Sequence, residues 1–109
     1  MSPDLIHTLI RDTLARAPHP APAGVVICLC AAWCNLCQDY RAVFEEAART
    51  HPALVFRWVD VEDEADALGD LDIATFPTLV VSNGQTVEHA GPLLPQAAHL
   101  LRLLRNLSR

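Results

Sequence analysis

Residues 25–37 have the sequence VVICLCAAWCNLC, and this stretch decides the fold. Its first six residues are continuously apolar and begin with β-branched side chains, which is typical of a strand buried on both faces, as in a parallel sheet. The apolar residues that follow recur at helical spacing from about residue 35 to residue 50, where a His-Pro pair ends the pattern. We therefore expect a buried strand that leads into a helix, with Cys34 and Cys37 at the junction.

The rest of the chain contains further helices and strands. Helices are predicted over residues 4–16 and 95–107, a short helix or turn over 63–70, and strands over 54–61, 78–82 and 86–90. Asn83-Gly84 between the last two strands is a strong hairpin signal. A strand–helix–strand unit requires parallel pairing, whereas a hairpin adds antiparallel strands. The sequence thus predicts one α/β domain over residues 1–109, a mixed sheet of about four strands with helices on both faces.

Composition and charge exclude several function classes. The chain has 13 acidic and 8 basic residues, and all of the basic residues are arginine. Without lysine, Schiff-base chemistry and a Walker-type phosphate lysine are excluded. No basic stripe of the kind that nucleic-acid binding requires is visible, so we expect no nucleic-acid partner. The five histidines are scattered without the spacing of metal ligands.

The distribution of apolar residues also bears on location. The longest apolar run, residues 25–34, is far shorter than the roughly 20 residues that a membrane helix needs, so we expect no membrane association. Near the N-terminus, Asp4, His7 and Arg11 interrupt the apolar residues, unlike the unbroken apolar stretch of a signal peptide. We expect a cytoplasmic protein, in which a disulfide is catalytic or redox-sensing rather than structural.

The Cys34-Asn35-Leu36-Cys37 motif carries the candidate chemistry. Backbone N–H groups and the dipole at a helix N-terminus stabilise a thiolate, so Cys34 is the predicted nucleophile. Two intervening residues place the second sulfur one helical turn away, where Cys37 can attack a mixed disulfide formed at Cys34 and release the substrate. A CxxC motif beside a strand–helix–strand pattern is itself a redox signature.

Several motifs in a fixed order over roughly residues 24–107 resemble the thioredoxin family. They are Trp33-Cys34-x-x-Cys37 after a buried strand, Phe76-Pro77-Thr78 farther along, the Asn83-Gly84 hairpin, and Gly91 before the last helix. The resemblance implies a thioredoxin-like fold and a cis bond before Pro77, which would lie against the active-site disulfide. It also implies that a groove for a substrate polypeptide is bordered by Trp33, Phe76, Pro77 and Gly91.

The sequence departs from this family at several positions. Residues 4–16 are predicted as a helix where the family usually begins with a strand, and Asn35-Leu36 replaces the usual Gly-Pro. Gln38 and Ala42 replace a common lysine and a helix-kinking proline. The buried aspartate expected six residues before the first cysteine is Cys28, and its companion lysine aligns with Trp58. Because the buried proton acceptor for Cys37 is missing, Cys28 is a candidate modulator of the resolving step.

The other two cysteines have several interpretations. Cys28 and Cys30 lie in an apolar strand and point the same way, so both are expected as buried core thiols. Cys28 could instead form an alternative disulfide with Cys37, which would require Cα atoms within about 7 Å. With Cys34, the four thiols could also hold a metal or an Fe–S cluster, although a closed tetrahedral site would require the strand to distort.

These observations lead to one expected function and one rival of a different class. We expect a thiol–disulfide oxidoreductase, chiefly a reductase, that exchanges two electrons with protein disulfides through Cys34 and Cys37 and needs neither a bound cofactor nor a metal. Its partners would be disulfide-bearing protein substrates and a recycling reductase. The rival is a non-catalytic thioredoxin-fold module that binds or chaperones one partner, which the missing acid and the unusual Asn35-Leu36 dipeptide favour.

Overall fold

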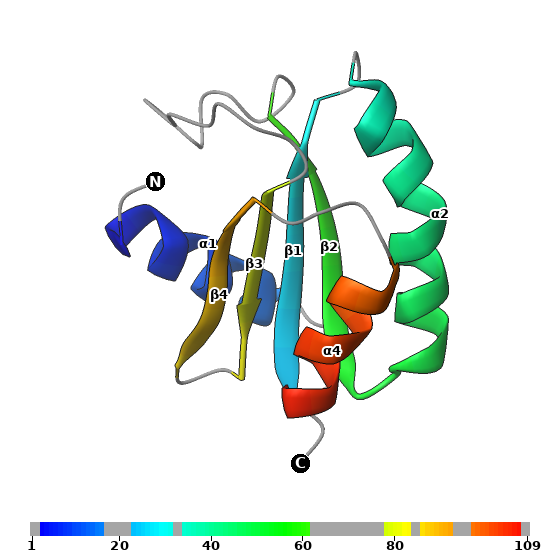
Figure 1. The fold of residues 1–109 in the computed structure, drawn as a ribbon. Helices are drawn as coiled ribbons and strands as arrows, with labels where there is room; N and C mark the ends of the chain where they lie inside the picture. The colour runs from blue at the N-terminus through cyan, green and yellow to red at the C-terminus, as the bar shows by residue number, and fades with distance from the viewer. Residues whose placement is uncertain are drawn as a thin grey trace.

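The computed structural model describes residues 3–16, 23–31, 34–61, 78–83, 86–92 and 97–107, which contain three helices and four strands (Figure 1). The helices are α1 (Pro3–Ala15), α2 (Asn35–Thr50) and α4 (Ala97–Leu107), and the strands are β1 (Gly24–Cys30), β2 (Leu54–Asp60), β3 (Thr78–Ser82) and β4 (Val87–Pro92). Each helix or strand predicted in these ranges is confirmed, and within the described residues its ends differ from the predicted ones by at most two residues. The short helix or turn predicted over residues 63–70 lies outside the described residues.

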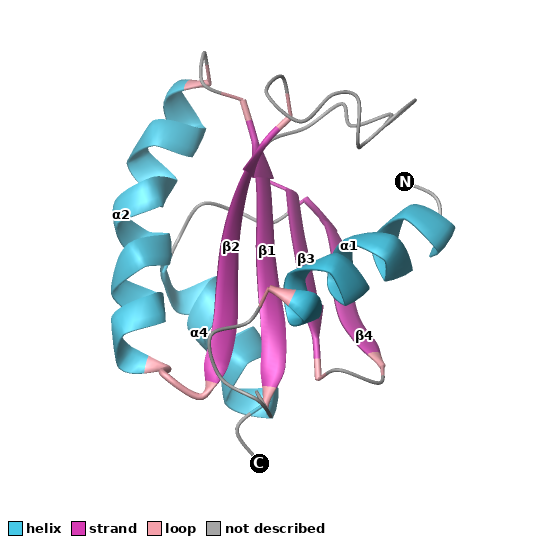
Figure 2. Cartoon of the chain, turned by 180° about the vertical axis from the view of Figure 1, so that it is seen from behind, coloured by secondary structure: helices cyan, strands magenta, loops and turns pink. Residues whose placement is uncertain are grey.

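The four strands form one mixed sheet in the order β2-β1-β3-β4. Strand β1 pairs parallel with β2 and antiparallel with β3, and β3 pairs antiparallel with β4. Helix α1 covers one face of the sheet, whereas α2 and α4 cover the other, as the two opposite views show (Figure 1, Figure 2). The predicted architecture is confirmed, and the first element that the structure describes is a helix, as expected.

Strand β1 is the centre of the molecule because both of its faces are covered. All seven of its residues are buried. Alternate side chains enter different cores: Val26, Cys28 and Cys30 pack with residues of α2 and α4, whereas the residues between them pack with α1. This alternation follows from the two-residue period of a strand. It places both strand cysteines on the face that α2 covers, as the sequence predicted.

Helix α1 is held against the sheet by apolar packing and by one ion pair. Leu9 and Ile10 are buried in the core that α1 shares with β1. Arg57 of β2 donates hydrogen bonds from Nη1 to Asp12 Oδ2 at 2.7 Å and to Thr13 Oγ1 at 3.2 Å. Its side chain is only 15% exposed, so α1 covers most of it. Within the described residues, no helix has the length and apolar character needed to cross a membrane.

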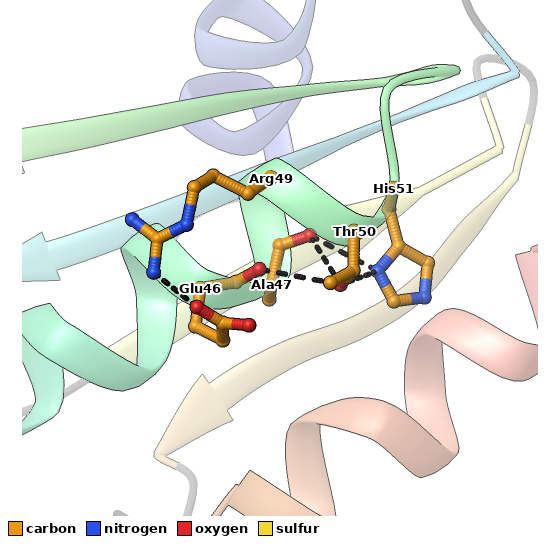
Figure 3. Close-up of polar contacts among 5 residues, drawn as sticks. All are labelled: Glu46, Ala47, Arg49, Thr50 and His51. Atoms are coloured by element: carbon orange, nitrogen blue, oxygen red, sulfur yellow. Dashed lines mark hydrogen bonds and ion pairs between the residues drawn. The ribbon is translucent and has the colours of Figure 1, made fainter.

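Helix α2 ends through side-chain contacts to its last carbonyl groups (Figure 3). Thr50 Oγ1 donates to the carbonyl oxygens of Glu46 and Ala47, each at 3.2 Å, and His51 Nδ1 lies 3.0 Å from the Ala47 oxygen. Arg49 pairs with Glu46 one turn earlier. The contacts of Thr50 and His51 satisfy the Ala47 carbonyl, one of those that a helix end leaves without intrahelical partners, and Pro52 prevents the helix from continuing.

The β3–β4 hairpin is closed by polar contacts at Asn83. The Asn83 N–H donates to the Thr86 oxygen at 3.2 Å, and the Thr86 N–H donates to Asn83 Oδ1 at 2.7 Å. Ser82 Oγ also donates to the Thr86 oxygen, at 2.9 Å. The predicted hairpin is therefore confirmed on both sides of the turn, although Gly84 itself lies outside the described residues.

The partly buried ion pair of Arg57 with Asp12 predicts unequal costs for two arginine substitutions. Arg57→Ala should lower the free energy of unfolding by about 1–2 kcal/mol, because it removes two hydrogen bonds under α1, one of them to a charged group. The matched control Arg49→Ala removes a pair whose side chains are 67% and 62% exposed, and should cost less than about 0.5 kcal/mol. Urea unfolding of the three proteins measures both effects, and equal costs would contradict the anchoring role of Arg57.

Candidate functional site

Cys34 lies at the N-terminal end of α2, directly before its first residue. Its backbone is extended, with φ −87° and ψ 116°, and it is the N-cap of the helix. Its N–H donates to the Ala31 oxygen at 3.1 Å, and its own oxygen accepts from the Gln38 N–H at 3.2 Å. The side chain is half-buried. This thiol therefore lies where the first N–H groups of α2 favour negative charge and where a partner can reach it.

Cys37 lies in the first turn of α2 but faces the interior. Its side chain is only 1% exposed and belongs to the core between α2 and the sheet, whereas Cys34 packs against the margin of that core. The two residues of the motif thus differ in access. Cys34 is the more exposed of the two.

The disulfide in this structure joins Cys37 to Cys30, whereas the sequence predicted a pair between Cys34 and Cys37. The Cα atoms of Cys30 and Cys37 lie 5.8 Å apart, and Cys34 and Cys28 carry free thiols. The expectation that Cys30 is an unbonded core thiol is therefore wrong for this state. The physical reason is that Cys30 ends β1 on the face that α2 covers, and Cys37 points inward to the same place.

Cys28 is a fully buried free thiol beside this disulfide. Its Sγ lies 3.4 Å from Cys30 Sγ, and no part of the side chain is exposed. Burial raises the pKa of Cys28 to about 12, because a thiolate would lose its solvation there. A thiol that holds its proton so strongly cannot accept one from Cys37 near neutral pH. The alternative disulfide considered from the sequence, between Cys28 and Cys37, is not present in this structure.

Tyr40 is a polar residue of this core that the sequence analysis did not single out as functional. Its side chain is fully buried, and among the described residues its hydroxyl has no hydrogen-bond partner. Burial raises the pKa of Tyr40, and negative charge on Cys28 would raise it further. The only signal in the sequence is that Tyr40 follows Cys37 by three residues, which places the two on one helix face.

Trp58 lies at the edge of the core, next to Cys28. The two residues are register partners in the parallel pairing of β1 with β2. The indole ring packs edge-on against Phe44, with ring centroids 5.5 Å apart, and the Arg41 guanidinium carbon lies 5.1 Å from the centroid of the indole. The place that the resemblance assigns to an aspartate and a lysine thus contains a thiol beside an aromatic ring.

Of the predicted groove residues, the structure describes only Gly91. Trp33, Phe76 and Pro77 lie outside the described residues, so their roles and the cis bond stay predictions. Gly91 pairs with Leu79, which pairs with Cys28, so it lies in the same row across the sheet as the buried thiol. Its φ of +158° is a conformation that side chains of L residues rarely adopt, and this explains the glycine.

Two further features of the surface and core bear on ligands. A groove of about 440 Å³ lies between α2 and α4, and none of the cysteines is among its lining residues Ala42, Val43, Glu46, Ala47, Thr50, Leu100 and Leu101.

In the part of the chain that the structure describes, no group of three or more His, Cys, Asp or Glu side chains is arranged to hold a metal ion. Two of the four sulfurs that a metal site would need are joined to each other.

The fold, with two cysteines at the start of α2, defines a thioredoxin-like protein, and comparison of its structure with known ones supports this class. Thioredoxin O1 from Arabidopsis thaliana superposes with a TM-score of 0.70 and 19% identity over 97% of this chain and 88% of that one. Spinach chloroplast thioredoxin f superposes with a TM-score of 0.72 and 20% identity over 95% and 83%.

Sequence comparison then gives the family. The profile of the thioredoxin family matches residues 17–104, so the chain belongs to the thioredoxin family. A Streptomyces coelicolor protein that carries the name of a thioredoxin 2 is 37% identical over 75 residues, which are 68% of this chain and 56% of that protein. Thioredoxin-1 of Caenorhabditis elegans is 30% identical over 71 residues, 64% of this chain and 61% of that one. The match spans less than two thirds of the length of these relatives.

The buried Cys28 thiol predicts a loss of stability at alkaline pH. Its pKa rises on folding from about 9 to about 12, so above about pH 9 the unfolded chain loses a proton that the folded chain keeps. The contribution of the protonated Cys28 thiol to the free energy of unfolding is therefore complete below about pH 9, and it declines as the pH rises further. Urea unfolding at near-neutral pH and at about pH 10 should show that wild type loses more stability than Cys28→Ala. The control Val26→Ala, a substitution on the same face of β1, should lose as much stability between these two pH values as wild type does.

The Tyr40 hydroxyl, which has no hydrogen-bond partner among the described residues, predicts that its removal is favourable. Tyr40→Phe should raise the free energy of unfolding by about 1 kcal/mol, because a buried hydroxyl without a partner retains its desolvation cost. Urea unfolding of the oxidised protein measures the change. A variant less stable than wild type would show that this hydroxyl is hydrogen-bonded.

Proposed function

We propose that this protein is a thiol–disulfide oxidoreductase that exchanges two electrons with protein disulfides through Cys34 and Cys37. One observation carries the proposal: in a chain of the thioredoxin family, a half-buried cysteine occupies the N-cap position of α2 and a second cysteine lies in the first turn behind it. The cysteine at the helix N-terminus is the accessible one, and the thiolate is the form of a cysteine that attacks disulfides.

The reaction needs both cysteines as thiols at the start. The Cys34 thiolate attacks one sulfur of the substrate disulfide, forms a mixed disulfide and releases the other substrate sulfur as a thiolate, which takes up a proton. Cys37 then loses its proton and attacks Cys34 Sγ, which frees the second substrate thiol. The substrate gains two electrons and two protons, and the protein is left with a disulfide. A recycling reductase must return the two electrons.

We propose reduction as the direction, and a reducing compartment, the cytoplasm, as the place. The relatives that match the chain carry the names of thioredoxins, and one solved neighbour with a TM-score of 0.71 comes from a study of thiol resolution in a yeast mitochondrial 1-Cys peroxiredoxin through glutathione and thioredoxin systems. A reducing compartment would keep Cys34 and Cys37 as the dithiol that reduction requires.

Two alanine variants test the assignment of the nucleophile. In the reduction of insulin by dithiothreitol, Cys34→Ala should lower the rate to that of dithiothreitol alone, because it removes the accessible thiolate. Cys30→Ala should keep most of the wild-type rate, because Cys30 is buried and does not contact the substrate. Turbidity of precipitating insulin measures the rates.

Two outcomes would contradict the proposal. Equal loss in both variants would remove the distinction between Cys34 and Cys30. A wild-type protein that gives no acceleration, while its Cys34 thiol still reacts with an alkylating reagent, would favour the non-catalytic binding module.

A further inference from the structure

We infer that Cys30 is a third redox cysteine, which competes with Cys34 for Cys37 so that the oxidised protein exchanges between two disulfides. The inference rests on the proposed function, since it adds a partner to the Cys34–Cys37 pair. It assigns a chemical role to a residue that the sequence analysis interpreted as a buried core thiol.

The position of Cys37 makes both pairings available. Cys37 is bonded to Cys30 in this structure, across a Cα separation of 5.8 Å that is ordinary for a disulfide. Cys34 lies three residues before Cys37 at the start of the same helix and packs against the core that contains both bonded cysteines. Residues at this spacing are neighbours on a helix surface. The sulfur of Cys37 thus has one partner on the strand and one on its own helix.

Exchange between the two disulfides requires no external oxidant or reductant. Cys34 loses its proton, and its thiolate attacks Cys37 Sγ of the Cys30–Cys37 bond. The Cys34–Cys37 bond forms as the Cys30–Cys37 bond breaks, and the Cys30 sulfur leaves as a thiolate that takes up a proton. One disulfide and one thiol are present before and after, so no electrons are gained or lost. The leaving sulfur is buried, which makes it a poor leaving group and the step slow.

The two oxidised forms differ in what they present to a partner. In the Cys34–Cys37 form, the disulfide includes the half-buried sulfur and a reductase can reach it. In the Cys30–Cys37 form, both bonded residues are only 1% exposed, and Cys34 remains a thiol. The second form therefore stores the oxidising equivalents away from solvent and keeps an attacking thiol at the surface. Any mixed disulfide that it makes cannot be resolved by Cys37.

Cys28 provides the matched control for this inference. Its sulfur lies 3.4 Å from that of Cys30 and faces the same core, yet it carries a free thiol. If any sulfur in this core could form a disulfide with Cys37, Cys28 would do so as readily as Cys30. If the disulfide requires a cysteine at the end of β1, next to α2, only Cys30 can form it.

The test is a disulfide map of variants that lack Cys34. Oxidised Cys34→Ser should still form one intramolecular disulfide, between Cys30 and Cys37. Adding Cys28→Ala to Cys34→Ser should leave this bond in place, and adding Cys30→Ala should abolish it. After acid quenching and alkylation, cleavage by chymotrypsin after Trp33 and Leu36 separates Cys30, Cys34 and Cys37 for mass spectrometry, whereas trypsin leaves all four cysteines in the peptide 17–41.

The wild-type protein gives a second readout that does not depend on a substitution. Mapping of the oxidised protein should find both disulfides, and its reduction by dithiothreitol should be biphasic, with a slow phase that Cys30→Ala removes. The inference is overturned if Cys34→Ser forms no internal disulfide or joins Cys28 to Cys37, or if oxidised wild type contains only the Cys34–Cys37 bond. Insulin turnover by wild type reports separately on the proposed function, so the failure of one is distinguishable from the failure of the other.

Discussion

The burial of β1 on both faces is the constraint on which the rest of the structure depends. Burying one Val, Ile or Leu side chain contributes about 1.5–3 kcal/mol, and all seven residues of this strand are covered. To cover both faces the chain must supply helices on each, which are α1 on one side and α2 with α4 on the other. The same strand ends where α2 begins, so the packing that stabilises the domain also sets the distance between strand and helix cysteines.

Much of the fold follows from short patterns in the sequence. The continuous apolar run predicted a central strand, the Asn83-Gly84 pair predicted the hairpin, and helical spacing predicted α2 to within its observed ends. The last helix was predicted over residues 95–107, and the structure describes it over Ala97–Leu107, because residues 95 and 96 lie outside the described residues. Local signals of this kind identify an element more reliably than its ends.

The pairing of the cysteines is the part that the sequence did not predict. Strand alternation correctly placed Cys28 and Cys30 on one face, and helical geometry correctly placed Cys37 one turn from Cys34. Which sulfur Cys37 meets depends on how closely α2 crosses the end of β1, and that distance is set by the packing of the whole core. The Tyr40 hydroxyl, unpaired within the part of the chain that the structure describes, was missed for the same reason, since an unpaired donor is defined by what surrounds it in space.

The choice between the two disulfides is coupled to the packing of α2 on the sheet. A Cys34–Cys37 bond closes a loop within one helix end and constrains little else, whereas a Cys30–Cys37 bond ties β1 to α2. Helix α2 is also held against the sheet by the edge-on contact of Phe44 with Trp58 of β2 and by the Arg41 guanidinium over the indole ring. Contacts that keep α2 close to the sheet therefore favour the Cys30–Cys37 disulfide. A partner that draws the start of α2 away from β1 favours the Cys34–Cys37 disulfide. Because linkage is reciprocal, a partner that binds only one of the two forms must shift the disulfide equilibrium toward that form.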